Sequence, residues 1–393
     1  MATVKPATNR IASLDQFRGY TVAGMFLVNF VGSFAVTPLI LKHHNTYCSY
    51  ADTIMPQFFF AVGFAFRLTF GRRAQIDGLP SAYFHMVRRM LGLALVALVM
   101  YKAPTAAQTW NMLVEKGPWE AIKGSQKDWF QTLMHIAVTS LWILPVIRAS
   151  ALARIAYMIA SAALQVVLSY WFYYHWVNLH GIDGGVLGFL TWTIPTLVGT
   201  LACDAVTAPD GRARVATMFV WSAILMGLGY LLSCGTTLYD VPAEQITSAH
   251  DQQRAEDAVL PDRERLETHT IAWAEPPFVP PPDQDHRKEN YWMMSQRAAT
   301  ISYHIFGAGF SLAVYALFYI ACDIWGLRLG LFRTLGTNAL VGYILHGIVG
   351  DAVDRFIAKD APLWYVAAGF LVYFGITYMF IRHLEKNNIY LKL

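Results

Sequence analysis

The chain has 393 residues, of which 55% are hydrophobic and only 14% are charged. Soluble domains usually carry about 25% charged residues, and the deficit extends along most of this chain, which excludes a soluble domain with one membrane anchor. The net charge of +4 is small and gives no indication of nucleic-acid binding. We expect no cleavable signal peptide, because the first apolar segment carries Asp15 and Arg18 and is too long for an apolar signal region.

Apolar runs that approach membrane-spanning length recur along the whole sequence. A helix needs about 20 apolar residues to cross the hydrocarbon core, and two of the runs, Met90–Tyr101 and Thr334–Val349, are short by this measure. The sequence predicts an all-α, polytopic transmembrane helical bundle of about ten spans, with residues 1–393 forming a single domain. The predicted spans are Tyr20–Ile40, Thr53–Phe70, Met90–Tyr101, Phe130–Ile147, Ala151–Tyr173, Val186–Ala202, Val215–Leu232, Ala298–Ala321, Thr334–Val349 and Leu363–Ile381.

Lysine and arginine residues gather in every second connection between these runs. Such connections face the cytoplasm in most membrane proteins. The pattern predicts an integral membrane protein, expected in a bacterial inner membrane, with both termini in the cytoplasm and an even number of spans. The basic residues that carry the pattern are Lys5, Arg10, Arg18, Arg67, Arg72, Arg73, Arg88, Arg89, Arg148, Arg154, Arg212, Arg214, Arg328, Arg333, Arg382, Lys386 and Lys392.

One long interruption, Ser233–Met294, is acidic and rich in proline. The topology places it outside, where it either caps an outward-facing cavity or is a simple surface excursion. A second outer segment, Ala103–Lys127, is predicted to form an amphipathic helix at the interface. Cys48 and Cys234 also lie on the outer side, where they either form a disulfide or are small buried apolar residues.

Two histidines and a carboxylate lie between the first two predicted spans. Lys42-His43-His44 ends the first span and Asp52 opens the second, and titratable groups are costly beside lipid. Imidazole moves protons near neutral pH, and an aspartate can orient it as a general base. Asn29, in the middle of the first span, either lines a cavity or bonds a neighbouring helix. The alternative to this catalytic role is that the two histidines are structural or solvated. Because they are adjacent in the sequence, they are poorly placed to bind one metal ion together.

Further polar residues occur near other span ends. Asn338 and His346 are eight residues apart and are expected on one helix face, where they bind an acceptor or form an interhelical polar ladder. His135 is also predicted on the outer side. Arg18, Arg88 and Arg89 are predicted on the cytoplasmic side, where they either bind phosphate or only anchor the helices. The chain has no nucleotide-binding glycine loop, no HExxH and no GxSxG, which disfavours an ATP-driven pump and a metalloprotease.

Several of these motifs resemble heparan-α-glucosaminide N-acetyltransferase-like proteins. The opening of the chain is similar to that family's R-x-x-S-[VL]-D-x-[FL]-R-G pattern, and Asn29 resembles its asparagine in the following helix. Lys42-His43-His44, Ala51-Asp52 and Pro56 resemble its [KR]-H…[AT]-D-L-x-F-P stretch. Lys288–Ser295, with Trp292, is similar to K-x-N-L-W-[ST]-x-S. Thr337–His346 resembles its helix with N-[SA] and Y-x-x-H. The matched stretches are Arg10–Gly19, Lys42–Pro56, Lys288–Ser295 and Thr337–His346.

The chain departs from the family pattern in three places. Asn45–Ser49 replaces W-x-G-L-T, which bears on acceptor specificity. His135 stands where an arginine is usual. The histidine alignment is ambiguous by one residue: His43 is preferred because it follows the basic residue, and His44 remains open.

The resemblance implies acetyl transfer from cytoplasmic acetyl-CoA, as a co-substrate and without a metal, to an amino group or hydroxyl of a saccharide outside. His43 or His44 would be the catalytic residue, with Asp52 and Asn29 orienting it, while arginines hold the coenzyme. Asn338, His346, His135 and Trp292 would contact the acceptor. The partners are then acetyl-CoA, the saccharide and the lipid bilayer, with a homodimer left open. The alternative is a transporter or flippase for a small anionic or glycan substrate, which also needs intramembrane polar residues.

Overall fold

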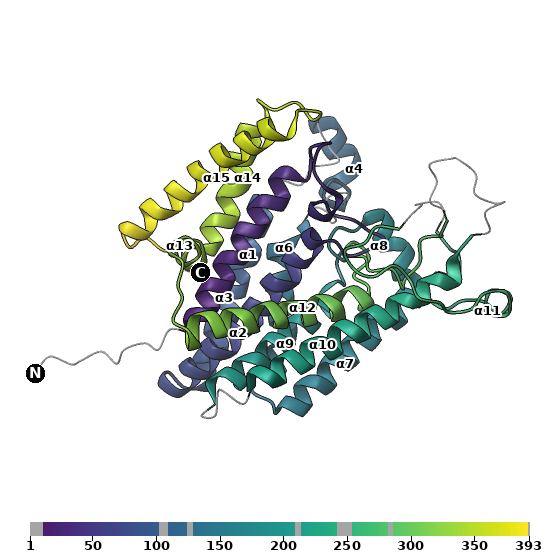
Figure 1. The fold of residues 1–393 in the computed structure, drawn as a ribbon, viewed down its shortest axis with the longest axis horizontal. Helices are drawn as coiled ribbons and strands as arrows, with labels where there is room; N and C mark the ends of the chain where they lie inside the picture. Colours follow the sequence, from purple (N-terminus) through teal and green to yellow (C-terminus); the bar gives the residue numbers. More distant parts are fainter. Residues whose placement is uncertain are drawn as a thin grey trace, which may run out of the picture.

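The protein is described here from a computed structural model, which covers residues 11–101, 109–123, 129–208, 214–241, 254–281 and 286–391. Within these ranges every regular element is helical, and extended pairing is limited to two isolated bridges. The prediction of an all-α fold is confirmed (Figure 1). The α-helices are α1 (Ala12–Val31), α2 (Tyr50–Ile76), α3 (Leu79–Met100), α4 (Trp110–Lys123), α6 (Thr132–Ile143), α7 (Ala151–Leu168), α8 (Tyr174–His180), α9 (Phe189–Thr207), α10 (Arg214–Ser233), α11 (Arg263–Thr268), α12 (Ile301–Tyr319), α13 (Gly330–Thr337), α14 (Ala339–Asp354) and α15 (Leu363–Lys386).

Short 3₁₀ and π segments extend several of these helices. Among the described residues, seven continuous helices are long and apolar enough to cross a membrane, and Thr132–Val146 is a shorter apolar helix. Together with α1 and α14 they correspond to the ten predicted runs, so a polytopic membrane protein with roughly eight to ten spans is confirmed. The seven are Tyr50–Ile76, Leu79–Met100, Ala151–His180, Phe189–Thr207, Val215–Tyr239, Ile301–Ile324 and Leu363–Lys386.

The first helix differs from its predicted bounds. Helix α1 runs from Ala12 to Val31 instead of Tyr20–Ile40, so Asn29 lies near its end and not at its middle. Its polar start is tolerated because Gln16 is buried and bonds both the carbonyl and the amide of Leu329. His43 and His44 therefore follow α1 in a connection that contains only the 3₁₀ turn η1 (Leu39–Leu41), and are not at the end of the helix itself.

The predicted span Thr334–Val349 is broken at Asn338. This residue has non-helical backbone angles and separates the short helix α13 from α14. Helix α13 packs against α1 so closely that a Cβ on Gly19 would lie 1.8 Å from the carbonyl oxygen of Phe332. The break lets the chain reach α1 with α13 and then turn into α14.

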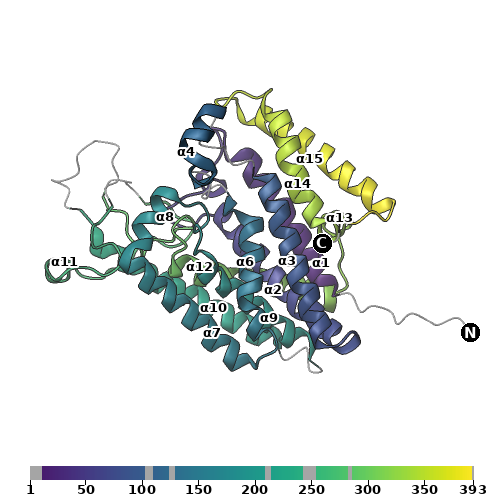
Figure 2. The same ribbon diagram turned by 180° about the vertical axis from the view of Figure 1, so that it is seen from behind.

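The interior of the bundle is formed by α2, α9 and α12, which contact one another, with α10 packed along α12 (Figures 1 and 2). Helices α2 and α9 approach backbone to backbone. A Cβ on Gly63 would lie 1.9 Å from the carbonyl oxygen of Thr196, and one on Gly199 would lie 2.1 Å from that of Phe60. Small residues at helix crossings are the usual means of close packing in membranes. Helices α1, α13, α14 and α15 form a neighbouring group, in yellow-green and purple in Figure 1.

The described part of the Ser233–Met294 loop is compact. It contains α11 and a cluster of buried side chains packed on α8, and it is held by ion pairs from Arg265 to Asp257 and from Arg287 to Asp240 and Glu275. None of its described residues lines the His43 cavity defined in the next section, but Phe278 bonds the carbonyl of Cys48 through its backbone amide, so the loop packs on the connection that carries His43 and His44. Cys48 and Cys234 are both buried and unpaired. Of the predicted segment Ala103–Lys127, the described residues 109–123 contain helix α4, which is interrupted at Gly117; the two ends of the segment lie outside the described residues.

Candidate functional site

A cavity of about 560 Å³, termed here the His43 cavity, lies where the ends of several helices meet. Its size is within the roughly 300–1,000 Å³ that is usual for small-molecule sites. Five polar side chains predicted from the sequence line it: Asn29, His43, His44, Asp52 and His346. They come from the end of α1, the connection after it, the start of α2 and the middle of α14, so the fold joins residues from opposite ends of the chain.

His43 and Asp52 form a hydrogen-bonded pair. The Nδ1 atom of His43 lies 2.9 Å from Oδ1 of Asp52, and in the described part of the chain no hydrogen bond engages its Nε2. The Asp52 side chain is 2% exposed, whereas that of His43 is 49% exposed because it faces the cavity. A buried carboxylate bonded to Nδ1 fixes the tautomer that leaves Nε2 available as a base.

Asp52 is itself held by the start of α2. Ser49 and Asp52 form a reciprocal capping box, in which the backbone amide and the hydroxyl of Ser49 each lie 2.9 Å from Oδ2 of Asp52. A carboxylate in the first turn of a helix is also stabilised by the positive end of the helix dipole. These bonds therefore hold the carboxylate in a fixed orientation although it is buried.

His44 lines the same cavity but has a different set of contacts. Its Nε2 atom lies 2.9 Å from the carbonyl oxygen of Leu39, and its ring stacks on Tyr47 at 4.3 Å between centroids. One ring nitrogen is thus engaged with the backbone and the ring is fixed against an aromatic side chain. Of the two adjacent histidines, only His43 has its ring bonded to a carboxylate.

The sequence suggested that Asn29 orients His43. In the structure the side chain of Asn29 bonds His346 instead. The amide nitrogen of Asn29 lies 3.3 Å from Nε2 of His346, whose Nδ1 bonds the carbonyl oxygen of Tyr343. Since Nδ1 must donate to that carbonyl, Nε2 accepts from Asn29. This pair forms a second wall of the cavity, and it fixes His346 as a neutral ring.

Asp183 is a carboxylate of this cavity that sequence reasoning missed. It lies in the connection between α8 and α9 with φ of 55°, an uncommon conformation for a residue other than glycine. Its Oδ1 accepts a bond of 2.7 Å from Gln296, and its carbonyl accepts a bond of 2.8 Å from the indole of Trp192. The available signal was the one used for Asp52, namely a lone carboxylate immediately before an apolar span.

The two carboxylates and His43 influence one another. Burial disfavours protonation of His43, but the hydrogen bond and charge of Asp52 and the charge of Asp183 outweigh it, so the pKa of His43 is raised above its usual 6.5. Burial raises the pKa of Asp183 above 3.8, although its bond from Gln296 and the nearby His43 oppose the shift. The cavity therefore favours positive charge at the imidazole, which is the charge that a general base acquires.

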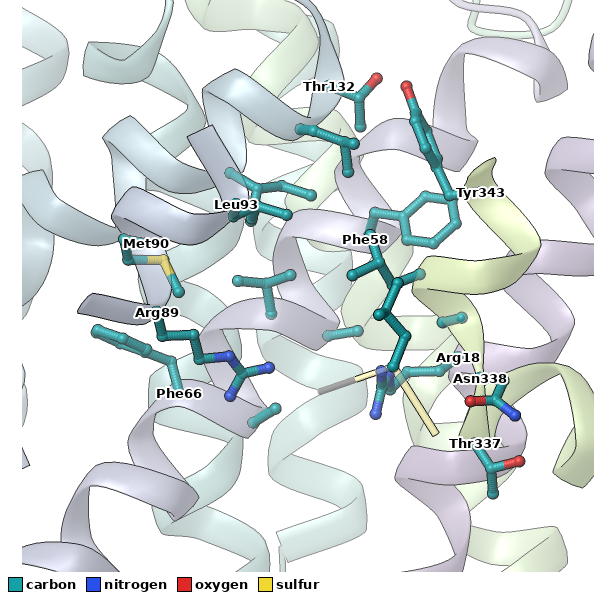
Figure 3. Close-up of a pocket in the computed structure, with 18 residues that line it drawn as sticks. Arg18, Phe58, Phe66, Arg89, Met90, Leu93, Thr132, Thr337, Asn338 and Tyr343 are labelled. Atoms are coloured by element: carbon teal, nitrogen blue, oxygen red, sulfur yellow. The ribbon is translucent and has the colours of Figure 1, made fainter. Parts of the chain in front are cut away.

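A second cavity of about 190 Å³, termed here the Arg18 cavity, is narrow and mostly apolar. The guanidinium groups of Arg18 and Arg89 lie at one end of it, and the hydroxyls of Thr132 and Tyr343 lie at the other (Figure 3). Asn338 belongs to this cavity and not to the one that contains His346; its amide nitrogen bonds the carbonyl of Ile389 at 3.2 Å. Arg88 is exposed and lines neither cavity.

The two cavities adjoin. Phe58, Thr132 and Tyr343 line both of them, so these three side chains form the junction. Helix α14 extends along this arrangement, with Asn338 before its start in one cavity, Tyr343 at the junction and His346 in the other cavity. A ligand that enters between Arg18 and Arg89 and one that contacts His43 would therefore meet beside Phe58, Thr132 and Tyr343.

Two predicted acceptor contacts lie away from both cavities. His135 is fully buried in α6, near Trp192 and Phe130, and faces neither cavity. Trp292 packs in the compact loop, where its indole donates a bond of 3.1 Å to the carbonyl of Val259. Spacing along the sequence could not separate these buried roles from exposure to a cavity.

Comparison with known protein families identifies the relatives of this arrangement. The family described as Heparan-alpha-glucosaminide N-acetyltransferase, catalytic, matches residues 10–229, which is more than half of the chain. The chain belongs to this family. Membership implies an acetyltransferase, and the family uses acetyl-CoA as co-substrate. No curated protein sequence gives a match. The matched region includes Asn29, His43, Asp52 and Asp183, and it ends before α14.

Proposed function

We propose that this heparan-α-glucosaminide N-acetyltransferase family member transfers an acetyl group from acetyl-CoA, bound in the Arg18 cavity, to a saccharide amine or hydroxyl in the His43 cavity. The observation that carries the proposal is that the two cavities share a junction and that the His43–Asp52 pair lines one of them. Each substrate then has its own entrance, and the reacting groups meet inside the protein.

The residues of the Arg18 cavity are suited to the coenzyme. The cavity is too small for the whole of coenzyme A, but a slender acyl-carrying arm needs only a narrow apolar channel. Guanidinium groups bind phosphate oxygens in a fork geometry, and Arg18 and Arg89 lie where the phosphates of the coenzyme would remain outside the channel. The basic connections at this end of the bundle support a cytoplasmic position for it.

His43 is the general base of the proposed reaction. Its Nε2 takes the proton from the acceptor as the amine or hydroxyl attacks the thioester carbon, and Asp52 stabilises the resulting imidazolium. When the tetrahedral intermediate collapses, the carbon–sulfur bond breaks and the imidazolium returns its proton to the thiolate of coenzyme A. Asp183, on the same cavity, is placed to bind the acceptor amine or hydroxyl through its carboxylate.

The test uses the full chain purified in lipid nanodiscs, with radiolabelled acetyl-CoA and glucosamine or other amino sugars as acceptors. His43→Gln should reduce acetyl transfer by about 10²–10⁴-fold, the usual contribution of a positioned general base. Binding of coenzyme A should persist, because the arginines lie in the other cavity. His180→Gln, at the exposed end of α8, is the matched control and should retain activity.

Two outcomes would change the assignment. Loss of activity in His44→Gln with full activity in His43→Gln would move the base to His44. Full activity in both variants would remove the histidines from the mechanism. If the wild-type protein moved a labelled sugar across liposomes without acetylating it, the transporter alternative would replace the transferase.

A further inference from the structure

The junction between the two cavities contains a chain of hydrogen bonds that ends at Tyr343. The hydroxyls of Tyr343 and Tyr101 are 2.7 Å apart, and the hydroxyl of Tyr101 lies 3.0 Å from the backbone nitrogen of Leu133. Tyr343 lines both cavities, whereas Tyr101 lines only the His43 cavity. Figure 3 shows the Tyr343 hydroxyl beside that of Thr132, at the end of the Arg18 cavity remote from the arginines.

The direction of these bonds follows from the donors available. Leu133 is in the first turn of α6, where backbone N–H groups have no partner within the helix, and the N-cap residue of α6, Gln131, provides no side-chain cap. The Leu133 N–H therefore donates to the Tyr101 oxygen. Tyr101 can then donate its own proton to the Tyr343 oxygen, and the hydroxyl of Thr132, which also bonds Tyr343, can donate to the second lone pair of that oxygen. With both bonds accepted, the Tyr343 proton is left for a group at the junction.

The start of α6 strengthens this chain. The N-terminal end of a helix carries partial positive charge, and bonds in a series polarise one another in a medium of low dielectric constant. The Tyr343 hydroxyl is thereby made a better donor than an isolated phenol. Such a donor is useful where negative charge develops during a reaction.

We propose that Tyr343 is an oxyanion-stabilising catalytic residue: its hydroxyl donates to the thioester oxygen of acetyl-CoA at the junction, with Tyr101 as the positioning residue. The inference rests on the proposed acetyl transfer. As the acceptor attacks, the carbonyl π electrons move to oxygen, and the Tyr343 proton stabilises that charge without being transferred. When the carbon–sulfur bond breaks, the electrons return and the carbonyl re-forms.

Steady-state kinetics give the first test. Tyr343→Phe should lower kcat by about 10²–10³-fold, as removal of one oxyanion donor does elsewhere, with the KM for acetyl-CoA nearly unchanged. Tyr101→Phe should lower kcat by about tenfold, the equivalent of one weakened hydrogen bond. Tyr157→Phe is the matched control: its hydroxyl bonds the Trp142 carbonyl at 2.8 Å, outside both cavities, and its removal should leave kcat unchanged. A kcat for Tyr343→Phe within threefold of wild type would overturn the assignment.

Infrared spectroscopy provides a second test that does not depend on turnover. Acetyl-CoA labelled with ¹³C at the carbonyl is bound to the His43→Gln protein, in which transfer is blocked. The carbonyl band should move to lower frequency on binding, and His43→Gln/Tyr343→Phe should lose this shift while still binding the ligand. An unshifted band in the first protein would refute the hydrogen bond.

The two tests separate this inference from the proposed function. Acetyl transfer that needs His43 but not Tyr343 overturns only the oxyanion role. A Tyr343-dependent band shift, in a protein whose wild-type form acetylates no acceptor, supports the hydrogen bond and overturns the proposed transfer. Failure of acetyl-CoA to bind at all overturns both.

Discussion

Replacing Asp52 with asparagine should abolish most activity through the histidine that Asp52 orients. Oδ2 of the aspartate accepts two bonds from Ser49, one from its backbone amide and one from its hydroxyl. An asparagine must keep its oxygen on that side, because an NH₂ group there would face the Ser49 amide. Its NH₂ group then faces Nδ1 of His43, which lies 2.9 Å from Oδ1 in the native protein.

The consequence is a change of tautomer. Nδ1 of His43 becomes a hydrogen-bond acceptor, so the ring proton moves to Nε2, the atom that must accept the proton of the acceptor. A histidine held in the wrong tautomer lowers kcat by about 10⁴-fold in serine proteases. We expect a loss of about 10³–10⁴-fold here, or roughly 4–5.5 kcal/mol of transition-state stabilisation at 1.36 kcal/mol for each factor of ten.

The assay measures kcat and the KM for acetyl-CoA over a range of pH in nanodiscs. The capping bonds are preserved, so the thermal midpoint of Asp52→Asn should fall by only a few degrees. Any residual activity should have its acid limb at lower pH than wild type, because removal of the carboxylate charge lowers the raised pKa of His43 and leaves the base neutral to lower pH. Activity within tenfold of wild type, or an acid limb moved to higher pH, would refute the reasoning.

Three further predictions follow from the packing and the arginines. Arg18→Gln and Arg89→Gln should each raise the KM for acetyl-CoA by about tenfold, with kcat maintained at saturation. Arg88 lines neither cavity, so Arg88→Gln should leave the KM unchanged. Equal effects of all three substitutions would contradict the proposed coenzyme site. Gly63→Leu should prevent the approach of α2 to α9 and yield aggregated protein in gel filtration, whereas Gly227→Leu, which meets nothing within 4 Å, should be tolerated. In a cysteine-free background, an impermeant reagent should label Ile271→Cys but not Ile76→Cys in intact cells; these side chains are 67% and 69% exposed, and reversed labelling would invert the topology.

The sequence predicted the class of fold well because burial in lipid leaves a strong local signal. Each apolar run became a helix, since a backbone in hydrocarbon must bond within its own segment. The errors arose where tertiary contacts outweigh hydropathy. The polar start of α1 is stabilised by the bonds from Gln16 to Leu329, and the break at Asn338 accommodates the packing of α13 on α1. Neither contact leaves a local pattern in the chain.

The candidate site was predicted only in part. Asn29, His43, Asp52 and His346 were recognisable because a titratable or amide side chain beside a span is costly unless it has a role. The pairing of Asp52 with His43 was expected and is present, but Asn29 was also expected to orient the histidine and instead bonds His346. Tyr101 and Tyr343 resemble any other aromatic residue of a membrane helix, so only their position at the junction distinguishes them.

The arrangement of the polar groups favours a transferase over a transporter. A transporter must expose one binding site to both sides in turn, commonly by moving symmetric repeats around broken helices at mid-membrane. In the described chain, the two cavities differ in chemistry, with arginines and apolar side chains in one and a histidine–carboxylate pair in the other. Two unlike cavities that meet at Tyr343 match two unlike substrates that exchange one small group. In the proposed reaction an acetyl group would pass this junction without either substrate crossing the membrane, so the transfer would require no large alternating motion.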